Sequence, residues 1–271
     1  MPEAPLKPAL ELRHISLSFG QGDVLKDISF TIPMGGTLVL LGVAASGKSV
    51  LLKLVLGLFK PDEGEILVDG QNIVPLPEAA LGPFRRRMGI VFQEGALFDS
   101  LSVLENVAYR LYEEGERDEQ AIERRVREVL GFVEMEQAID KMPSELSGGM
   151  RRRVAIARAI VNNPSIMLYD SPTAGLDPVT SHTINVLLAK LRDVGNVSSI
   201  VVTHRLQDAF VLSNFVYSVE KKGLVAASSN GGAEALTRTT FLILRDGGIH
   251  FIGSVRDLRG SSDPYLQRFL S

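Results

Sequence analysis

The chain has 271 residues, 45% of them hydrophobic, and its 29 basic and 32 acidic side chains leave a formal net charge of −3. This balance gives no global indication of a nucleic-acid partner, and the absence of cysteine excludes a disulfide framework and cysteine-ligated zinc. No apolar run approaches the roughly 20 residues that span a bilayer, and the first residues lack a secretory apolar core. We therefore expect a soluble chain that folds as one large domain or two closely joined lobes.

The first predicted elements are two strands. Residues 11–19 and 24–32 alternate apolar and polar side chains, and a Gly-Gln-Gly-Asp turn lies between them. Alternation of period two around a glycine-rich turn is typical of a β-hairpin. We expect Phe19 to lie beside this turn.

The next segment has the pattern of a phosphate-binding loop, G-x-x-x-x-G-K-S. A β-prone apolar run over 37–41 precedes it and an apolar stretch of helical length over 50–59 follows it, as this loop requires. Backbone N–H groups of such a loop converge on phosphates, the lysine reaches the β- and γ-phosphates, and the serine hydroxyl holds Mg²⁺. The residues predicted to bind the nucleotide here are Gly42, Val43, Ala44, Ala45, Ser46, Gly47, Lys48 and Ser49.

A nucleotide site gives Phe19 two interpretations, and the sequence leaves both open. The ring is either a half-buried strand residue or a platform for the adenine base, because every base has a π-face. We therefore include Phe19 among the candidate nucleotide-binding residues.

The composition changes after the strand predicted over 87–92, which leads to Gln93. Residues 102–159 are helix-rich and carry dense mixed charge. The arginine clusters at 85–87, 124–125 and 151–153 have acidic neighbours, so we interpret them as solvated helix faces and not as a nucleic-acid surface.

From residue 166 the α/β alternation resumes. A strand ends at Asp170, a helix follows over 179–194, and a strand over 199–202 precedes His204. This order predicts an α/β nucleotide-binding lobe that is interrupted by a helical subdomain.

A second helix start with anion-binding character lies at Ser147. This residue is a good N-cap, and Gly148 and Gly149 expose N–H groups at the positive end of the helix predicted over 151–161. The chain thus has two such helix starts but one full phosphate loop. A composite site that a second copy of the chain closes would explain both, and an ordinary capped helix is the alternative.

Together these motifs resemble the ATP-binding cassette (ABC) transporter ATPases. The phosphate loop, Gln93, Leu-Ser-Gly-Gly-Met, Asp170, Leu-Asp at 176–177 and His204 follow in one order at familiar spacings. The resemblance covers about residues 10–253 and implies an α/β P-loop NTPase (RecA-like) domain with an antiparallel β subdomain and an inserted helical subdomain. It places the RecA-like lobe at about 10–93 and 160–253, the helical subdomain at about 94–159, and a C-terminal tail at 254–271.

The resemblance implies ATP hydrolysis with Mg²⁺ and a role for each motif. Asp170 would hold Mg²⁺ through water, and Ser49 and Gln93 would contact the same ion. His204 would contact the γ-phosphate and orient the attacking water. The Leu-Ser-Gly-Gly-Met turn of one subunit would cover the γ-phosphate on the phosphate loop of the other. The residues that would act across this homodimer are Ser147, Gly148, Gly149, Met150 and Asp177.

Two positions of the phosphate loop depart from the family pattern. Ala44 and Ala45 lie where the family usually has Ser or Gly. We expect the motif to tolerate alanine, provided that the backbone there does not need a positive φ.

A further departure concerns catalysis. Ser171 follows Asp170 where the family places the glutamate that polarises the attacking water. Loss of general-base help typically lowers the rate roughly 10²–10⁴-fold, so we expect slow hydrolysis that relies on Lys48, His204, Mg²⁺ and positioning. The alternatives are a substitute carboxylate, with Glu94 the nearest in sequence, and ATP binding with hardly any turnover.

Three stretches resemble the ATPases of Mla/Mce-type systems, which drive MCE-protein lipid transport. They are residues 92–103, 145–150 and 263–270. This implies a homodimer at the cytoplasmic face of the inner membrane, bound to permease subunits that work with an MCE-domain protein, and no nucleic-acid partner. The apolar segment 95–98 lies where the family receives a permease helix, although local core packing would also explain it. The rival interpretations are an ABC ATPase for another substrate, a nucleic-acid-acting cassette, and an ATP-gated subunit with little hydrolysis.

One segment, about 214–240, is about two dozen residues longer than the family pattern needs. Its Ala-Ala-Ser-Ser-Asn-Gly-Gly stretch has a flexible composition, so we expect a mobile surface loop. A final hairpin with an Asp-Gly turn at 246–247 follows.

Overall fold

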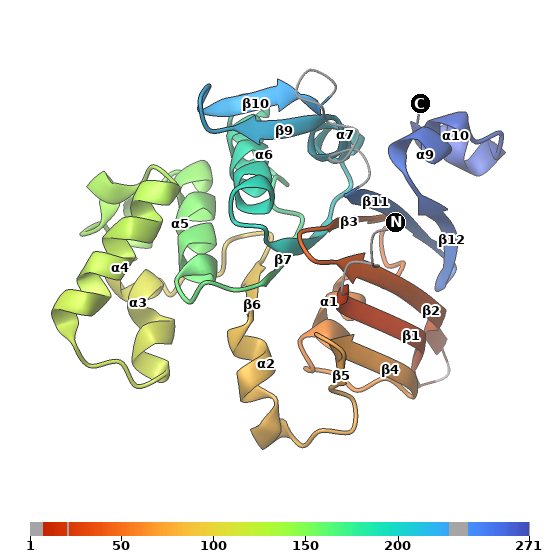
Figure 1. Cartoon of the computed structure of the whole chain (residues 1–271), viewed down its shortest axis with the longest axis horizontal. Helices are drawn as coiled ribbons and strands as arrows, with labels where there is room; N and C mark the ends of the chain where they lie inside the picture. Colours follow the sequence, from red (N-terminus) through yellow and green to blue (C-terminus); the bar gives the residue numbers. More distant parts are fainter. Residues whose placement is uncertain (1–7, 21, 228–237, 271) are drawn as a thin grey trace, which may run out of the picture.

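The computed structural model describes residues 8–20, 22–227 and 238–270, and a six-stranded sheet forms its centre (Figure 1). The strands of this sheet are β3 (Thr37–Gly42), β6 (Met88–Val91), β7 (Ile166–Asp170), β8 (Ser198–Val202), β11 (Thr239–Arg245) and β12 (Gly248–Gly253). Their order is β12-β11-β3-β8-β7-β6, and all neighbours are parallel except the β11–β12 pair. Every residue of β3 is buried, which is why its sequence is a continuous apolar run and not an alternation.

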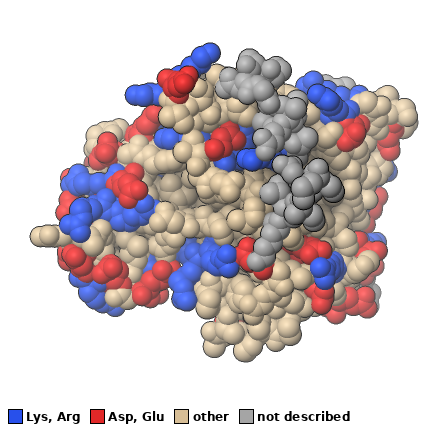
Figure 2. All heavy atoms as spheres, in the orientation of Figure 1, with Lys and Arg blue, Asp and Glu red and all other residues tan. Residues whose placement is uncertain are grey.

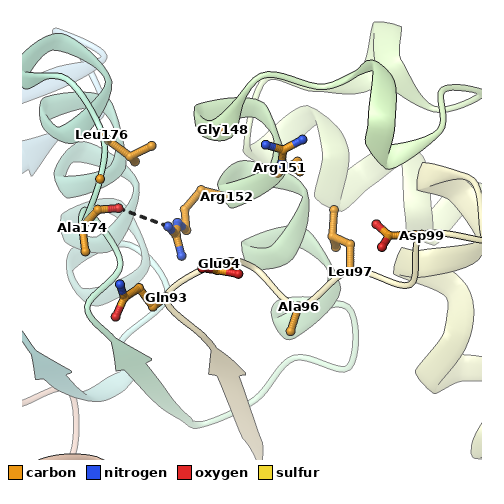
Figure 3. A pocket seen from close by; sticks show the side chains of 11 residues that line it. Gln93, Glu94, Ala96, Leu97, Asp99, Gly148, Arg151, Arg152, Ala174 and Leu176 are labelled. Atoms are coloured by element: carbon orange, nitrogen blue, oxygen red, sulfur yellow. Dashed lines mark hydrogen bonds between the residues drawn. The ribbon is translucent and has the colours of Figure 1, made fainter.

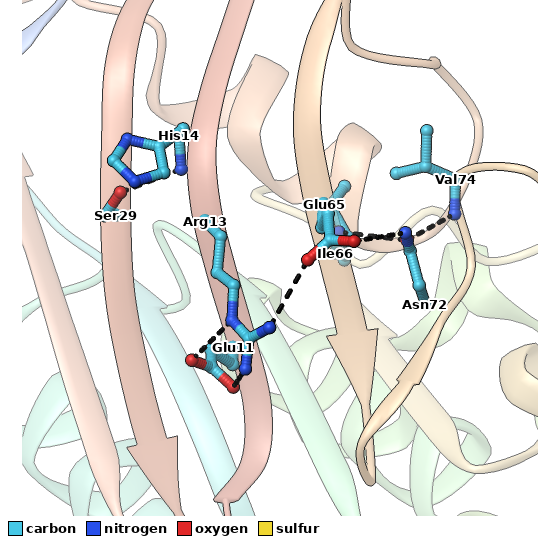
Figure 4. Close-up of polar contacts among 8 residues, drawn as sticks. All are labelled: Glu11, Arg13, His14, Ser29, Glu65, Ile66, Asn72 and Val74. Atoms are coloured by element: carbon cyan, nitrogen blue, oxygen red, sulfur yellow. Dashed lines mark hydrogen bonds and ion pairs between the residues drawn. The ribbon is translucent and has the colours of Figure 1, made fainter.

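A second, antiparallel sheet has the order β2-β1-β4-β5. Its strands are β1 (Pro8–Phe19), β2 (Gly22–Pro33), β4 (Glu63–Val68) and β5 (Gln71–Asn72), and β1 with β2 forms the predicted hairpin. Figure 4 shows polar side chains on this sheet: Arg13 donates to Glu11 at 2.8 and 2.9 Å and to Glu65 on β4 at 3.3 Å. Because these groups are exposed, the ion pairs contribute little stability.

Helix α1 (Lys48–Val55) follows the phosphate loop and joins the two sheets through one core. Leu51 and Leu54 of this helix are fully buried and belong to the same apolar cluster as Leu12 of β1 and Leu40 of β3. The helix therefore fixes the phosphate loop to both sheets, and its first residue is Lys48.

Three helices form a separate group, at the left of Figure 1. They are α3 (Val103–Glu113), α4 (Glu119–Phe132) and α5 (Gly148–Ile160). Ser102 and Glu105 form a capping box at the start of α3, and Asp118 caps α4. Basic and acidic side chains are interspersed over this group on the face that Figure 2 shows.

The remaining helices flank the sheets. They are α2 (Gly82–Arg86), α6 (Pro178–Asp193), α7 (Leu206–Asn214), α9 (Val255–Gly260) and α10 (Pro264–Leu270), with 3₁₀ turns η1 (Glu78–Ala80), η2 (Glu136–Ala138) and η3 (Pro143–Glu145). Within the described ranges, none of the helices combines the length and apolar character that crossing a membrane requires.

The segment predicted to be a mobile loop is in part an ordered hairpin. Strands β9 (Phe215–Ser218) and β10 (Gly223–Ala226) pair antiparallel, and the end of α6 holds them, because Arg192 donates to the carbonyl of Phe215 at 2.8 Å and Asp193 accepts from the N–H of Tyr217 at 2.7 Å. The loop prediction is therefore wrong for 215–226, where β-prone residues find partners on α6. Residues 228–232 of the predicted flexible stretch lie outside the described residues.

Candidate nucleotide-binding site

A cavity of about 440 Å³ lies at the carboxyl ends of β3, β7 and β8. The carboxyl edge of a parallel sheet is where open α/β folds bind their ligands. The cavity brings together most of the predicted site residues, and its lining comprises Val24, Ala44, Ala45, Ser46, Gly47, Lys48, Ser49, Val50, Gln93, Asp170, Ser171, Val202 and His204.

Lys48 is the buried cation of this cavity, with 6% of the residue exposed. Its ammonium donates to the carbonyl oxygens of Gly42 at 3.0 Å and Val43 at 2.7 Å and to the hydroxyl of Ser46 at 3.2 Å. Burial lowers the pKa of Lys48, and the charge of Asp170 opposes that shift. A phosphate oxygen that replaced these neutral acceptors would offer the ammonium a full negative charge.

We expect the two alanines of the phosphate loop to be tolerated if the backbone there needs no positive φ, and one of the two does not meet this condition. Ala45 has φ 59°, in the left-handed region, whereas Ala44 is not among the positive-φ residues. A Cβ in this region lies too close to the carbonyl oxygen and costs about 1–2 kcal/mol. Ala45 therefore carries backbone strain at the centre of the phosphate loop, and the expectation of a harmless substitution is wrong there.

Oxygen donors suited to Mg²⁺ meet beside Lys48. The Ser49 hydroxyl donates to Oδ2 of Asp170 at 2.9 Å, and the Ser171 hydroxyl donates to Oδ1 at 3.3 Å. Gln93 adds an amide oxygen to the same lining. Hard oxygen ligands, few in number and completed by phosphate and water, are what Mg²⁺ prefers. The donors present here fit a metal that is bound together with phosphates. No cluster of three or more His, Cys, Asp or Glu occurs in the described part of the chain.

Ser171, the position at which the resemblance predicts the water-polarising glutamate, lines the nucleotide cavity. It is 4% exposed, has φ 51°, and its N–H donates to the carbonyl of Val202 at 2.9 Å. Glu94 is not among the residues that line the nucleotide cavity; it lines a neighbouring cavity of about 500 Å³ with Asp99 and Arg152. The structure thus gives no support to Glu94 as the substitute carboxylate.

His204 lines the nucleotide cavity from the loop after β8 and is exposed. Phe19 does not line it: the residue is 49% exposed, and its ring packs edge-on against that of Phe59, with 5.5 Å between the ring centres. Val24 of β2 lines the cavity instead. Gly42 and Val43 do not line it either, but their carbonyls hold Lys48.

The Ser147 turn is a capped helix start, as predicted. Ser147 is the N-cap of α5 and accepts from the N–H of Met150 at 3.2 Å. Asp177 caps α6 in the same way, accepting from the N–H of Thr180 at 3.0 Å. The hydrogen bond from the Thr180 hydroxyl is the main reason why the pKa of Asp177 is lowered.

Lys48 and the Ser147 turn do not meet within one chain. Gly148 lines the 500 Å³ cavity, together with Leu176, and none of residues 147–150 lines the nucleotide cavity. The two predicted anion-binding helix starts therefore line different cavities, which share Gln93 in their linings.

Sequence reasoning missed two buried polar groups near the site. Arg152 is 5% exposed, so the interpretation of the 151–153 cluster as a solvated face is wrong for it. Arg85 and Arg125 of the other clusters also donate to backbone carbonyls. Asp208 is 4% exposed and accepts from the side chains of Thr173 and Asn185. Nothing in a single sequence distinguishes these residues from surface charges.

The loop, its lysine and the Ser49–Asp170 pair at the carboxyl edge of a parallel sheet define a P-loop nucleotide-binding protein. The sequence model of the family described as "ABC transporter" matches residues 25–174. The chain is 36% identical over 227 residues to the intermembrane phospholipid transport system ATP-binding protein MlaF of Escherichia coli K12, over 84% of this chain and 83% of that protein. It therefore belongs to the ABC transporter family and is an ABC-type ATPase.

Other relatives agree with this assignment. The probable ribonucleotide transport ATP-binding protein mkl of Mycobacterium bovis is 36% identical over 221 residues, which are 82% of this chain and 62% of that protein. The dimeric ATP-binding cassette MJ0796 bound to ADP and Pi has a TM-score of 0.75 at 30% identity, covering 91% of this chain and 99% of its own. The structure of cbiO1 from Clostridium perfringens has a TM-score of 0.76 at 25% identity, covering 97% and 95%. The expected family and fold class are thereby confirmed.

Proposed function

We propose that the chain powers a phospholipid transporter and that two copies form each ATP site together. The observation that carries the shared site is the separation of Lys48 from the Ser147 turn, which open into different cavities of one chain. A second copy facing the first would bring the helix start of Ser147 onto phosphates held by Lys48. The dimeric structure of a cassette with ADP and Pi supports the pairing of two copies.

Within each site, Lys48 and the N–H groups of the loop would hold the β- and γ-phosphates of ATP. Ser49, Gln93 and Asp170 would hold Mg²⁺, which neutralises phosphate charge when bound. Asp177 would lie in the loop that links the two sites of the dimer. These groups position and neutralise charge, which supplies most of the rate in phosphoryl transfer.

We propose slow hydrolysis, because the residue beside Asp170 is a serine. The buried Ser171 hydroxyl hydrogen bonds to Asp170 and has no basicity near neutral pH. His204, which lines the cavity from the opposite loop, would then orient the water without carboxylate help.

One surface suits the permease partner of such a system. Phe92, Phe98 and Tyr109 are 38%, 43% and 40% exposed and line a cavity of about 280 Å³ with Arg110 and Arg158. The guanidinium of Arg158 lies 5.8 Å from the centre of the Phe98 ring. We propose that this aromatic surface receives a cytoplasmic helix of the permease.

Core packing accounts for only part of the same segment. Leu97 packs against the helical core, whereas Phe98 remains exposed. Leu97 can therefore anchor the segment 95–98 in the helical core while the exposed Phe98 ring contacts a partner.

The names of the MlaF relatives support phospholipid as the cargo. We infer that the chain acts at the cytoplasmic face of the inner membrane, with permease subunits and an MCE-domain protein, and without nucleic acid. The proposals of a phospholipid cargo and of an MCE partner come from the resemblance to these relatives.

The test is to purify the chain with its candidate permease, reconstitute both in phospholipid liposomes, and measure ATPase rate and lipid transfer. We expect ATP-dependent lipid transfer, and Phe98→Ala should weaken binding to the permease. Phe215→Ala is the matched control, because Phe215 is 37% exposed on β9, in a different part of the fold. A permease that binds both variants equally would reject the docking surface, and ATP turnover without lipid transfer would reject the cargo.

A second function is an ATP-gated subunit that dimerises but hardly hydrolyses ATP. Ser171 is the observation that favours it. Lipid transfer supported equally by ATP and by a non-hydrolysable analogue would establish this alternative.

A further inference from the structure

Arg152 is a buried arginine that forms no salt bridge with the carboxylates of the described residues. It lies in α5, in the second turn after the Ser147 cap, and is 5% exposed. Of the ion pairs within 4.0 Å in the described part of the chain, none includes Arg152. Burial lowers its pKa, and the charge of Glu94 opposes that shift.

The guanidinium of Arg152 joins two loops of the nucleotide site to α5. One Nη donates to the carbonyl of Phe92 at 2.6 Å, and the other donates to the carbonyl of Ala174 at 3.4 Å. Phe92 immediately precedes Gln93, and Ala174 lies between Ser171 and Asp177. Figure 3 shows Arg152 reaching from α5 toward Ala174, with Gln93 and Glu94 beside it.

A second arginine of the same helix holds the other end of the Gln93 loop. Arg158 donates to the carbonyls of Gly95 at 2.8 Å and Ala96 at 2.7 Å. The segment 92–96 is thus tied to α5 at both ends, and Gln93 lies between the two ties. A displacement of α5 would therefore carry Gln93 with it.

Stability alone does not explain Arg152. Burial removes hydration from the Arg152 charge, and the charge of Glu94 does not fully offset this loss, because the pKa of Arg152 is still lowered. Apolar residues of similar volume often stabilise such a position better. Its Nε is also buried without a hydrogen-bond partner, which adds to the penalty. The planar guanidinium can, however, donate to two carbonyl oxygens at once and so hold them in a fixed position relative to each other.

We propose that Arg152 is a positioning residue, which holds Gln93 and the loop of Asp177 in one fixed relation to the Ser147 turn. Arg152 thereby couples the position of Gln93, at the metal of one ATP site, to the position of the Ser147 turn, at the phosphates of the partner's ATP site. This inference rests on the proposed function, since it needs Gln93 at the metal and the Ser147 turn at the partner's phosphate.

The experiment compares Arg152→Met and Arg152→Lys with Arg153→Met as the matched control. Arg153 is the next residue of the helix, and its contact is with the exposed Glu134 at 3.5 Å. Two quantities are measured on the full chain: the Kd of ATP with and without Mg²⁺, by fluorescence titration, and the kcat and KM of hydrolysis. The Mg²⁺-free Kd reports the phosphate loop, whereas the gain in affinity on adding Mg²⁺ reports the metal side of the site.

For Arg152→Met we expect a Mg²⁺-free Kd close to that of the parent. The gain in ATP affinity on adding Mg²⁺ should be about tenfold smaller than in the parent. The kcat should fall about tenfold to a hundredfold, with little change in KM. Arg152→Lys should lie between, because one ammonium keeps the charge but cannot span both carbonyls. Arg153→Met should match the parent.

The inference is overturned if Arg152→Met and Arg153→Met show the same gain in ATP affinity on adding Mg²⁺ and the same kcat. It is also overturned if Arg152→Met weakens ATP binding by the same factor with and without Mg²⁺. If Arg152→Met does not fold, Arg152→Lys decides by the same two quantities. A parent chain that binds no ATP, or binds it without regard to Mg²⁺, overturns the proposed function first and this inference with it.

Discussion

A Cβ atom on Gly149 would lie 2.3 Å from Cγ2 of Thr180, so α5 and α6 touch at their first turns. Thr180 is itself fixed, because its hydroxyl and N–H both donate to Asp177. The Ser147 turn and the Asp177 loop therefore meet at a contact that leaves no room for a side chain at residue 149.

Gly149→Ala should destabilise the protein by about 1–3 kcal/mol through this overpacking, measured by urea unfolding, and should lower ATPase activity. Gly148→Ala is the control, since a Cβ there would lie 3.5 Å from Cδ2 of Leu176, an ordinary contact. Adding Thr180→Ser to Gly149→Ala removes the clashing methyl but keeps the hydroxyl, so it should restore most of the loss. Equal losses of unfolding free energy in Gly148→Ala and Gly149→Ala would contradict the contact.

Under the proposal of slow hydrolysis, Ser171→Glu should raise steady-state ATPase activity by about 10²-fold or more, because it adds a general base beside Asp170. Ser171→Gln has nearly the same size at the same positive φ and lacks the carboxylate, so it should not accelerate turnover. The measurement is phosphate release at saturating ATP. Unchanged turnover in Ser171→Glu would show that the serine does not limit the reaction.

Ala45→Gly should stabilise the protein by about 1 kcal/mol, because glycine adopts φ 59° without strain. Ala44→Gly is the neighbouring control and should be neutral or destabilising, since glycine adds freedom to the unfolded chain. Urea unfolding of both variants decides. A destabilised Ala45→Gly would show that the loop relieves the strain elsewhere.

The lowered pKa of Lys48 predicts two opposite pH effects. The folded chain releases the Lys48 proton at a pH below its usual 10.5, so the unfolded chain binds more protons in the window just below that value. Stability contributed by this group therefore rises with pH across the window, while ATP affinity falls because the neutral amine attracts phosphate less. Urea unfolding and ATP titration over alkaline pH measure both effects, and the contribution of Lys48 is the difference between the parent and Lys48→Met. A difference of the reverse sign would contradict the burial of the charged amine.

The sequence predicts well those parts of the site that local patterns encode. The phosphate loop lies between β3 and α1, the Ser147 cap starts α5, and Asp170 ends β7, because capping and strand-to-helix turns depend on a few adjacent residues. The helix predicted over 50–59 is shorter and begins earlier, at Lys48–Val55.

What the sequence does not predict depends on contacts between distant segments. Gln93 and Glu94 are adjacent, yet only Gln93 lines the nucleotide cavity, and no motif sets which way each side chain points. Arg152 is buried because three segments converge on it. The left-handed φ of Ala45 is likewise invisible in a residue type that seldom adopts it.

The separation of Lys48 from the Ser147 turn has a consequence for mixed assemblies. Under the shared-site proposal, each of the two pockets takes its lysine from one chain and its capping turn from the other. A heterodimer of one chain lacking Lys48 and one lacking the Ser147 turn would hold one pocket with both lesions and one with neither. Two inactive preparations would then complement each other on mixing, and no heterodimer would regain more than half of the native complement of sites.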